Sequence, residues 1–176
     1  MISDLKGLQD FTRTGSIQWD SSWPELASED ERHYLFGYLE ERFGIPEDLF
    51  KEYLLFRRKQ SWQLIKSVPL VSTAAQLKVI KVGLRAFQKV GSFVKPTTRM
   101  IQLFGCKATR AILEIDEEQL AILQSGKELP VDMAIDRGYV ILTRKGKRVL
   151  GLGFFINGRV RSQISRKELR KAMLLY

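Results

Sequence analysis

The chain has 176 residues, a formal net charge of +9 and 44% hydrophobic residues, which suits one or two small folded domains. No apolar run approaches the roughly 20 residues that a membrane-spanning helix needs, and the N-terminus lacks a secretory pattern. We therefore expect a soluble, cytoplasmic protein. Because Cys106 and His33 are the only cysteine and histidine, the sequence offers no internal disulfide, no Cys/His zinc site and no nearby base for a nucleophile.

Charge is sorted into blocks along the chain. Residues 1–56 carry a net charge of −7, residues 57–111 carry +12 without a single carboxylate, residues 112–136 carry −6, and residues 137–176 carry +10. The basic blocks either form ion pairs with the acidic blocks in three dimensions or face a polyanion such as a nucleic acid. The sequence leaves both alternatives open.

The first elements in chain order are helices. Residues 1–25 have no clear period, and only a short strand around Ser16–Trp19 is expected there. Ser28 and Glu31 form a capping box, which begins a helix that ends at Gly44. A second, short helix is expected over Pro46–Tyr53, because proline is favoured in the first turn of a helix.

Strands follow the two helices. They are expected over Leu54–Arg58 and Ser61–Lys66, joined as a hairpin, and over Lys78–Lys81 and Arg85–Lys89, on either side of a break at Gly83. Pro96 is then expected to begin a helix that ends at Gly105. We place the domain boundary in Gly105–Lys107, so that residues 1–105 form an N-terminal domain and residues 106–176 a C-terminal one.

The C-terminal part predicts a β-rich module with two helices. Asp116 with Gln119, and Ser165 with Glu168, have the spacing of capping boxes at the start of those helices. Asn157–Gly158 favours a hairpin turn, because both residues tolerate positive φ. The strands expected around these elements are Thr109–Ile115, Gly138–Arg144, Val149–Ile156 and Arg159–Ile164.

The candidate functional residues lie in the last strand and the last helix. Two arginines share one face of the strand and three cations occupy the first two turns of the helix: Arg159, Arg161, Arg166, Lys167 and Arg170. Cations at a helix N-terminus oppose the helix dipole by about 0.3–1 kcal/mol each. A bound phosphate would reverse this sign, because it would meet free helix N–H groups and guanidinium groups together. The alternative is that these are exposed cations paired with Glu168 or with the acidic block.

Other residues are expected to support or border this surface. The supporting cations are Lys107, Arg110, Lys127 and Lys147. Aromatic candidates for base stacking are Phe87, Phe93, Tyr139 and Phe154, although core packing is the simpler explanation for each. Gly151 and Gly153 are not expected to form a dinucleotide-binding loop, because no third glycine and no helix follow them. They are expected to leave one face of a strand bare, so that a neighbouring backbone or, as the alternative, a nucleotide approaches closely.

The order of several motifs resembles the PUA domain, an RNA-binding module. These motifs are Gly126-Lys-Glu-Leu-Pro, Gly138-Tyr-Val-Ile-Leu, Val149-Leu-Gly-Leu-Gly and Asn157-Gly-Arg with the Arg-rich ending that follows. Their spacing is similar to the C-terminal PUA-like domain of Nop/Sun (fmu) type rRNA 5-methylcytosine methyltransferases. Residues 43–53 and 82–89, with Lys95-Pro-Thr, resemble the preceding domain of stand-alone pre-PUA plus PUA ribosome-biogenesis proteins.

The resemblance implies an α+β fold, in which an N-terminal mixed α/β pre-PUA domain precedes a C-terminal PUA-like β pseudobarrel with two helices. It also implies RNA binding without the methyltransferase body, since no Gly-rich cofactor loop and no catalytic cysteine motif are present. We expect a non-enzymatic protein, without cofactor or metal, that recognises structured rRNA or tRNA in ribosome biogenesis or RNA modification.

Two other functions stay open. In the first, the chain is an adaptor whose acidic residues 28–53 dock a modification enzyme or a ribosome-assembly factor. In the second, it is an enzyme with a carboxylate site that the sequence does not reveal.

Overall fold

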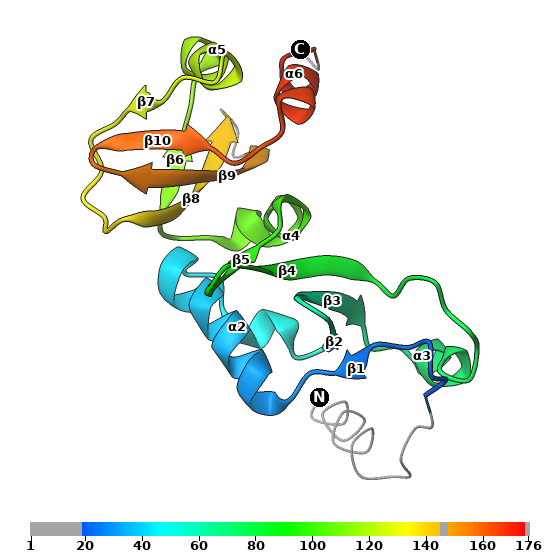
Figure 1. The fold of residues 1–176 in the computed structure, drawn as a ribbon. Coiled ribbons are helices and arrows are strands. Elements are labelled where there is room, and N and C mark those ends of the chain that lie inside the picture. Colours follow the sequence, from blue (N-terminus) through cyan, green and yellow to red (C-terminus); the bar gives the residue numbers. More distant parts are fainter. Residues whose placement is uncertain (1–18, 145–147, 175–176) are drawn as a thin grey trace, which may run out of the picture.

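The computed structural model describes residues 19–144 and 148–174 and contains two five-stranded sheets with helices packed on them (Figure 1). Helices and antiparallel strands are mixed along the chain, which confirms the predicted α+β class. No helix within these ranges is both long enough and apolar enough to cross a membrane. The strand expected around Ser16–Trp19 lies outside the described residues except for Trp19.

The first sheet is an antiparallel meander in chain order. Its strands are β1 (Glu25–Leu26), β2 (Tyr53–Arg58), β3 (Ser61–Lys66), β4 (Leu84–Val90) and β5 (Phe93–Pro96). The predicted hairpin of β2 and β3 is confirmed, and Lys59 in its turn has a φ of 55°. Helix α3 (Pro69–Ala74), which the sequence did not predict, connects β3 to β4. The strand expected over Lys78–Lys81 is wrong, because β4 already occupies the edge of β3 that such a strand would need.

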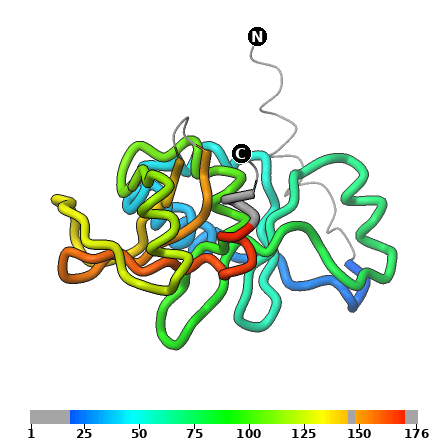
Figure 2. Tube along the Cα trace, turned by 90° about the horizontal axis from the view of Figure 1, so that it is seen from above, coloured from blue at the N-terminus to red at the C-terminus, as the bar shows by residue number. Residues whose placement is uncertain are grey.

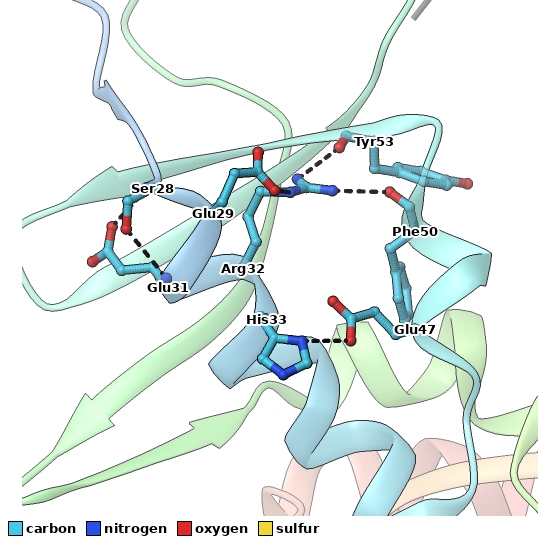
Figure 3. Close-up of polar contacts among 8 residues, drawn as sticks. All are labelled: Ser28, Glu29, Glu31, Arg32, His33, Glu47, Phe50 and Tyr53. Carbon is cyan, nitrogen blue, oxygen red and sulfur yellow. Dashed lines mark hydrogen bonds and ion pairs between the residues drawn. The ribbon is translucent and has the colours of Figure 1, made fainter. Parts of the chain in front are cut away.

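Helix α2 (Glu29–Phe43) covers the first sheet with a buried face of Leu35, Phe36, Leu39 and Phe43. The predicted capping box is confirmed: the Glu31 backbone N–H donates to the Ser28 hydroxyl, and the Glu31 carboxylate accepts from the Ser28 N–H (Figure 3). Gly44 ends the helix in the left-handed conformation.

An arginine fixes the chain that returns from α2 to the sheet. The Arg32 guanidinium donates to the carbonyl oxygens of Tyr53 at 2.9 Å and Phe50 at 3.3 Å (Figure 3). These bonds hold the 3-10 helix η1 (Glu47–Phe50) beside α2. The longer helix expected over Pro46–Tyr53 is wrong. The helical part ends at Phe50, and Tyr53 pairs with Lys66 as the first residue of β2.

Pro96 also has a different place from the one predicted. It ends β5, where its missing N–H is tolerated, and pairs with Phe87. Helix α4 (Thr98–Phe104) starts two residues later, because the Thr97 hydroxyl accepts from the Met100 N–H. The C-terminal end of α4 lies next to Gly105, as predicted, and the 3-10 helix η2 (Gly105–Lys107) follows.

The second sheet is mixed, with the strand order β6–β8–β9–β10–β7. The strands are β6 (Ile112–Glu114), β7 (Leu129–Pro130), β8 (Gly138–Arg144), β9 (Arg148–Ile156) and β10 (Arg159–Ser162), and the helices are α5 (Glu117–Gln124) and α6 (Arg166–Leu174). Only β6 and β8 run parallel, and α5 begins at the predicted Asp116–Gln119 capping box. The predicted Asn157–Gly158 turn is confirmed, with φ values of 51° and 69°.

Two strands of this sheet are shorter than expected. The strand predicted over Thr109–Ile115 begins only at Ile112, because the N–H groups of Thr109 and Arg110 donate to the Phe43 carbonyl at the end of α2. The strand predicted over Arg159–Ile164 ends at Ser162, whose hydroxyl accepts from the Ile164 N–H and turns the chain toward α6.

The two sheets share one continuous core of buried side chains, with α4 between β4 and β9. The Gln102 amide donates to the Leu150 carbonyl at 2.9 Å. Gly151 permits this contact, because a Cβ there would lie 2.8 Å from Ile164 Cγ1 and 2.9 Å from Thr98 Cγ2. The predicted packing role of this glycine is confirmed. The boundary between residues 105 and 106 stays a prediction.

Arg42 joins α2 to the second sheet, so its loss is expected to destabilise the whole fold. Its Nε donates to the Tyr139 carbonyl at 2.8 Å and its Nη2 to the Asp136 carbonyl at 3.0 Å. Arg42→Ala should lower the free energy of unfolding by about 1.5–3 kcal/mol, measured from urea denaturation. The exposed neighbour Glu41→Ala is the control and should stay within about 0.5 kcal/mol of the parent. An equal midpoint for both variants would contradict this role of Arg42.

Candidate nucleic-acid interface

The last strand and helix present all five predicted cations to solvent. Arg159 and Arg161 are exposed on one face of β10, while Val160 between them is buried. Arg166, Lys167 and Arg170 are exposed on α6. Alternation in β10 therefore separates a buried face that anchors the strand from a charged face that is open to a ligand.

The start of α6 is fixed by Ser165. Its hydroxyl accepts from the Glu168 N–H at 3.3 Å and lies 3.4 Å from the Glu168 carboxylate. Arg166 extends across to the end of α5, where its Nη2 lies 3.0 Å from the position that a Cβ on Gly126 would take. Lys127 directly follows this glycine and is exposed. The structure therefore brings the turn that carries Lys127 up to the start of α6.

The five cations on β10 and α6 have no acidic partner within the described part of the chain: no ion pair joins any of them to a carboxylate there. Ion pairs between blocks do occur elsewhere. Arg57 contacts Glu25 at 2.7 Å and Glu31 at 3.2 Å, and Lys66 contacts Glu52 at 3.4 Å. The acidic N-terminal block thus compensates part of the 57–111 block. In the C-terminal block Arg144 contacts Glu117 at 3.0 Å, whereas the five cations on β10 and α6 stay available.

The remaining predicted cations do not behave alike. Lys107 is exposed at the end of η2. Arg110 is also exposed, but its Nη2 donates to the Glu40 carbonyl at 2.7 Å and thereby helps to cap the end of α2. Lys147 lies outside the described residues.

The four aromatic candidates differ in exposure. Phe87 is wholly buried in the first sheet, whereas Phe93 is 74% exposed on β5. Tyr139 and Phe154 are half-buried neighbours in an edge-to-face arrangement, with ring centres 5.2 Å apart. Partial burial raises the pKa of Tyr139, so its hydroxyl stays neutral at physiological pH.

Two cations that the sequence did not assign to the predicted binding residues lie over these rings. The Arg137 guanidinium is 5.7 Å from the centre of the Phe154 ring, and Lys95 Nζ is 6.0 Å from the centre of the Tyr139 ring. Both distances fall within the range of cation–π contacts. The sequence carried no signal for the Lys95 contact, because Lys95 and Tyr139 lie in different sheets, are 44 positions apart and belong to strands that do not pair.

Other reactive groups are dispersed. Across residues 19–144 and 148–174, no three His, Cys, Asp or Glu side chains are placed to hold a metal ion. His33 Nδ1 lies 3.1 Å from a Glu47 carboxylate oxygen on the surface of α2, and Cys106 is exposed.

No protein-family model and no curated protein matches this chain. Solved structures do match it. One is a hypothetical protein from the hyperthermophilic archaeon Pyrococcus horikoshii, with 13% identity, a TM-score of 0.47, and coverage of 84% of this chain and 86% of that one. Another is a conserved PUA domain protein from Thermoplasma acidophilum, with 14% identity, a TM-score of 0.48, and coverage of 84% of each chain. Because both TM-scores are below 0.5, we base the function on the residues of this chain.

Arg110, which caps a helix, and Arg161, which is exposed on the surface, should differ in how much their loss lowers the free energy of unfolding. Arg110→Ala removes a hydrogen bond at the end of α2 and should lower the free energy of unfolding by about 0.5–1.5 kcal/mol. Arg161→Ala removes an exposed side chain and should change the free energy of unfolding by less than about 0.5 kcal/mol. Urea denaturation of both variants measures the difference. A larger loss for Arg161→Ala would show that Arg161 supports the fold and is not reserved for a ligand.

Proposed function

We propose that this protein is a non-enzymatic RNA-binding protein that contacts structured rRNA or tRNA through the β10–α6 surface, defined as Arg159, Arg161, Arg166, Lys167 and Arg170. The observation that carries the proposal is that all five cations are exposed and none forms an ion pair with a described carboxylate. Two of them, Arg166 and Lys167, also open a helix, where positive charge is unfavourable until an anion binds.

Phosphate is the anion that this arrangement fits. Guanidinium groups bind phosphate oxygens through two parallel N–H bonds, and the first N–H groups of a helix point toward a bound anion. Contacts of this kind position a protein on an RNA backbone and do not read its sequence. Folded RNA, recognised by its shape and backbone, is therefore the substrate class.

The domain division and the biological role belong to the same proposal. Residues 106–176 would form the PUA-like RNA-binding domain and residues 1–105 the preceding domain, as the resemblance of the motifs implies. Lys107 and Lys127 would extend the contact surface, while Arg110 would contribute charge from its place at the end of α2. Ribosome biogenesis or RNA modification would be the process served.

The test is the salt dependence of binding to a folded tRNA and to an rRNA fragment. For about five phosphate contacts, the logarithm of affinity should fall with the logarithm of salt concentration at a slope of roughly −3.5 to −4.5. Arg161→Glu/Arg166→Glu should weaken binding and flatten the slope by about one to two units, measured by fluorescence anisotropy.

A matched control makes the same charge change elsewhere. Lys78 and Lys81 are exposed in the loop between α3 and β4, at the other end of the molecule from α6 (Figure 1). Lys78→Glu/Lys81→Glu should leave the slope within half a unit of the parent if the contacts are local. An equal effect of the two double variants would contradict the assignment to β10 and α6.

A second candidate is the protein adaptor. Tyr34 is 64% exposed on α2 beside Asp30, in the acidic segment 28–53, and an exposed aromatic ring is common in protein interfaces. An adaptor should retain a modification enzyme or assembly factor after Arg161→Glu/Arg166→Glu and lose it after Tyr34→Ala, as measured by pull-down with purified partners. Loss of the partner only with the arginine variant would exclude this function.

A further inference from the structure

The structure places aromatic and cationic side chains in a row that crosses from the first sheet to the second. We propose that this row, named here the stacking track and defined as Phe93, Lys95, Tyr139, Phe154 and Arg161, binds a short unpaired segment of RNA. The inference rests on the proposed RNA-binding function and adds to it a substrate class, single-stranded nucleotides, and a place where they bind.

Strand register aligns the part of the track in the second sheet. Tyr139 on β8 is directly opposite Phe154 on β9, and Phe154 is directly opposite Arg161 on β10. Directly paired residues project from the same face of a sheet. The two rings and the guanidinium therefore stand side by side on one face, with Arg161 exposed and both rings half-buried.

Lys95 continues the row into the first sheet. Its Nζ lies 6.0 Å from the centre of the Tyr139 ring, which shows that β5 borders the aromatic pair. Phe93 precedes Lys95 by two positions on β5, so both side chains leave the same face of the strand. The β4–β5 turn projects from the side of the molecule on which β10 lies (Figure 2). The track thus runs from this turn to β10.

Phe93 gives the strongest sign that the track meets a ligand. It is 74% exposed, and Val90, its direct partner across the hairpin, is 50% exposed. Phe87, in the same sheet, is fully buried, and burial of an aromatic ring stabilises a fold. The exposed Phe93 ring does not contribute such stabilisation to the protein alone. A ligand that covers the ring would supply that burial.

Charge identifies the kind of ligand. No carboxylate occurs between residues 57 and 111, which includes the whole of the β4–β5 hairpin. Arg137 lies 5.7 Å from the centre of the Phe154 ring, so a cation stands beside each half-buried ring of the track. Within the described residues, Lys95, Arg137 and Arg161 form no ion pair with a carboxylate. Rings with cations beside them fit a ligand that has flat apolar faces and regularly spaced negative charges. RNA has such faces in its bases and such charges in its phosphates.

Stacking requires bases that are not paired. Bases inside an A-form duplex are covered by their neighbours, so their faces are closed to protein side chains. Unpaired bases can stack on Phe or Tyr while Lys and Arg follow the phosphates, and each stack usually changes affinity at least fivefold. The β10–α6 surface binds backbone in either form of RNA, whereas the stacking track requires an unpaired segment.

The experiment compares a labelled single-stranded octanucleotide RNA with a fully paired hairpin RNA, using the full chain. Phe93→Ala should weaken binding of the single strand about tenfold and binding of the hairpin less than twofold, measured by anisotropy. Ile80→Ala is the matched control, because Ile80 is 93% exposed in the α3–β4 loop, and it should change neither. Phe93→Trp should restore binding of the single strand.

A second readout reports on stacking directly. A 2-aminopurine base in the octanucleotide should lose fluorescence on binding to the parent protein, and this quenching should be smaller with Phe93→Ala and with Phe154→Leu. Phe154→Leu keeps an apolar side chain at a half-buried position and so preserves the fold. Circular dichroism of each variant confirms that it is folded.

The failures of the two proposals can be told apart. If Phe93→Ala binds the octanucleotide as the parent does, while Arg161→Glu/Arg166→Glu still weakens hairpin binding, the stacking track is wrong and the proposed function stands. If the parent binds neither RNA, both are wrong. Phe93-dependent binding to phosphatidylserine vesicles without binding to the octanucleotide would overturn the track in favour of a lipid surface.

Discussion

The carboxyl end of helix α2 fixes the position of the second sheet relative to the first. The last carbonyl groups of a helix have no partner within it and must find one elsewhere. Here the Phe43 carbonyl accepts from the N–H groups of Thr109 at 2.9 Å and Arg110 at 3.0 Å, at the point where the chain enters the second sheet. Arg42, in the last turn, donates to the carbonyl of Tyr139 in β8 and to that of Asp136, just before the strand. Because Lys95 belongs to the first sheet and Tyr139 to the second, the alignment of the stacking track depends on this joint.

Local signals in the sequence predicted the elements that local contacts decide. Ser28 and Asp116 cap their helices with their own neighbours three residues later, and Asn157–Gly158 turns the chain without help from elsewhere. Predictions were wrong where a distant strand competes. Tyr53 has a helix-like pattern before it, yet its pairing with Lys66 makes it a strand residue. A single sequence shows the helical spacing and not the partner that overrides it.

The candidate site shows the same division. Composition and strand period were enough to place Arg159 and Arg161 on one exposed face, because both depend only on alternation along β10. The function of Arg110 was beyond the sequence, since its partner, the Glu40 carbonyl, lies 70 positions away. The cation–π contacts of Lys95 and Arg137 were beyond the sequence for a related reason. Lys95 meets Tyr139 only because the two sheets are joined, and Arg137 meets Phe154 only because β8 and β9 pair. Charge counts identify a basic surface, and packing decides which cations are anchored.

Anchored arginines still contribute to that surface. Arg42 and Arg110 donate to backbone carbonyls, which are neutral, so their hydrogen bonds hold the guanidinium groups in place without cancelling their charge. Arg57 differs, because two carboxylates face it and compensate its charge. The joint between the sheets is therefore both the stabilising contact of the fold and a fixed source of positive potential beside the stacking track. Such a potential attracts a polyanion before any contact forms, so under the proposed function a structural arginine at this joint speeds RNA association without touching a phosphate.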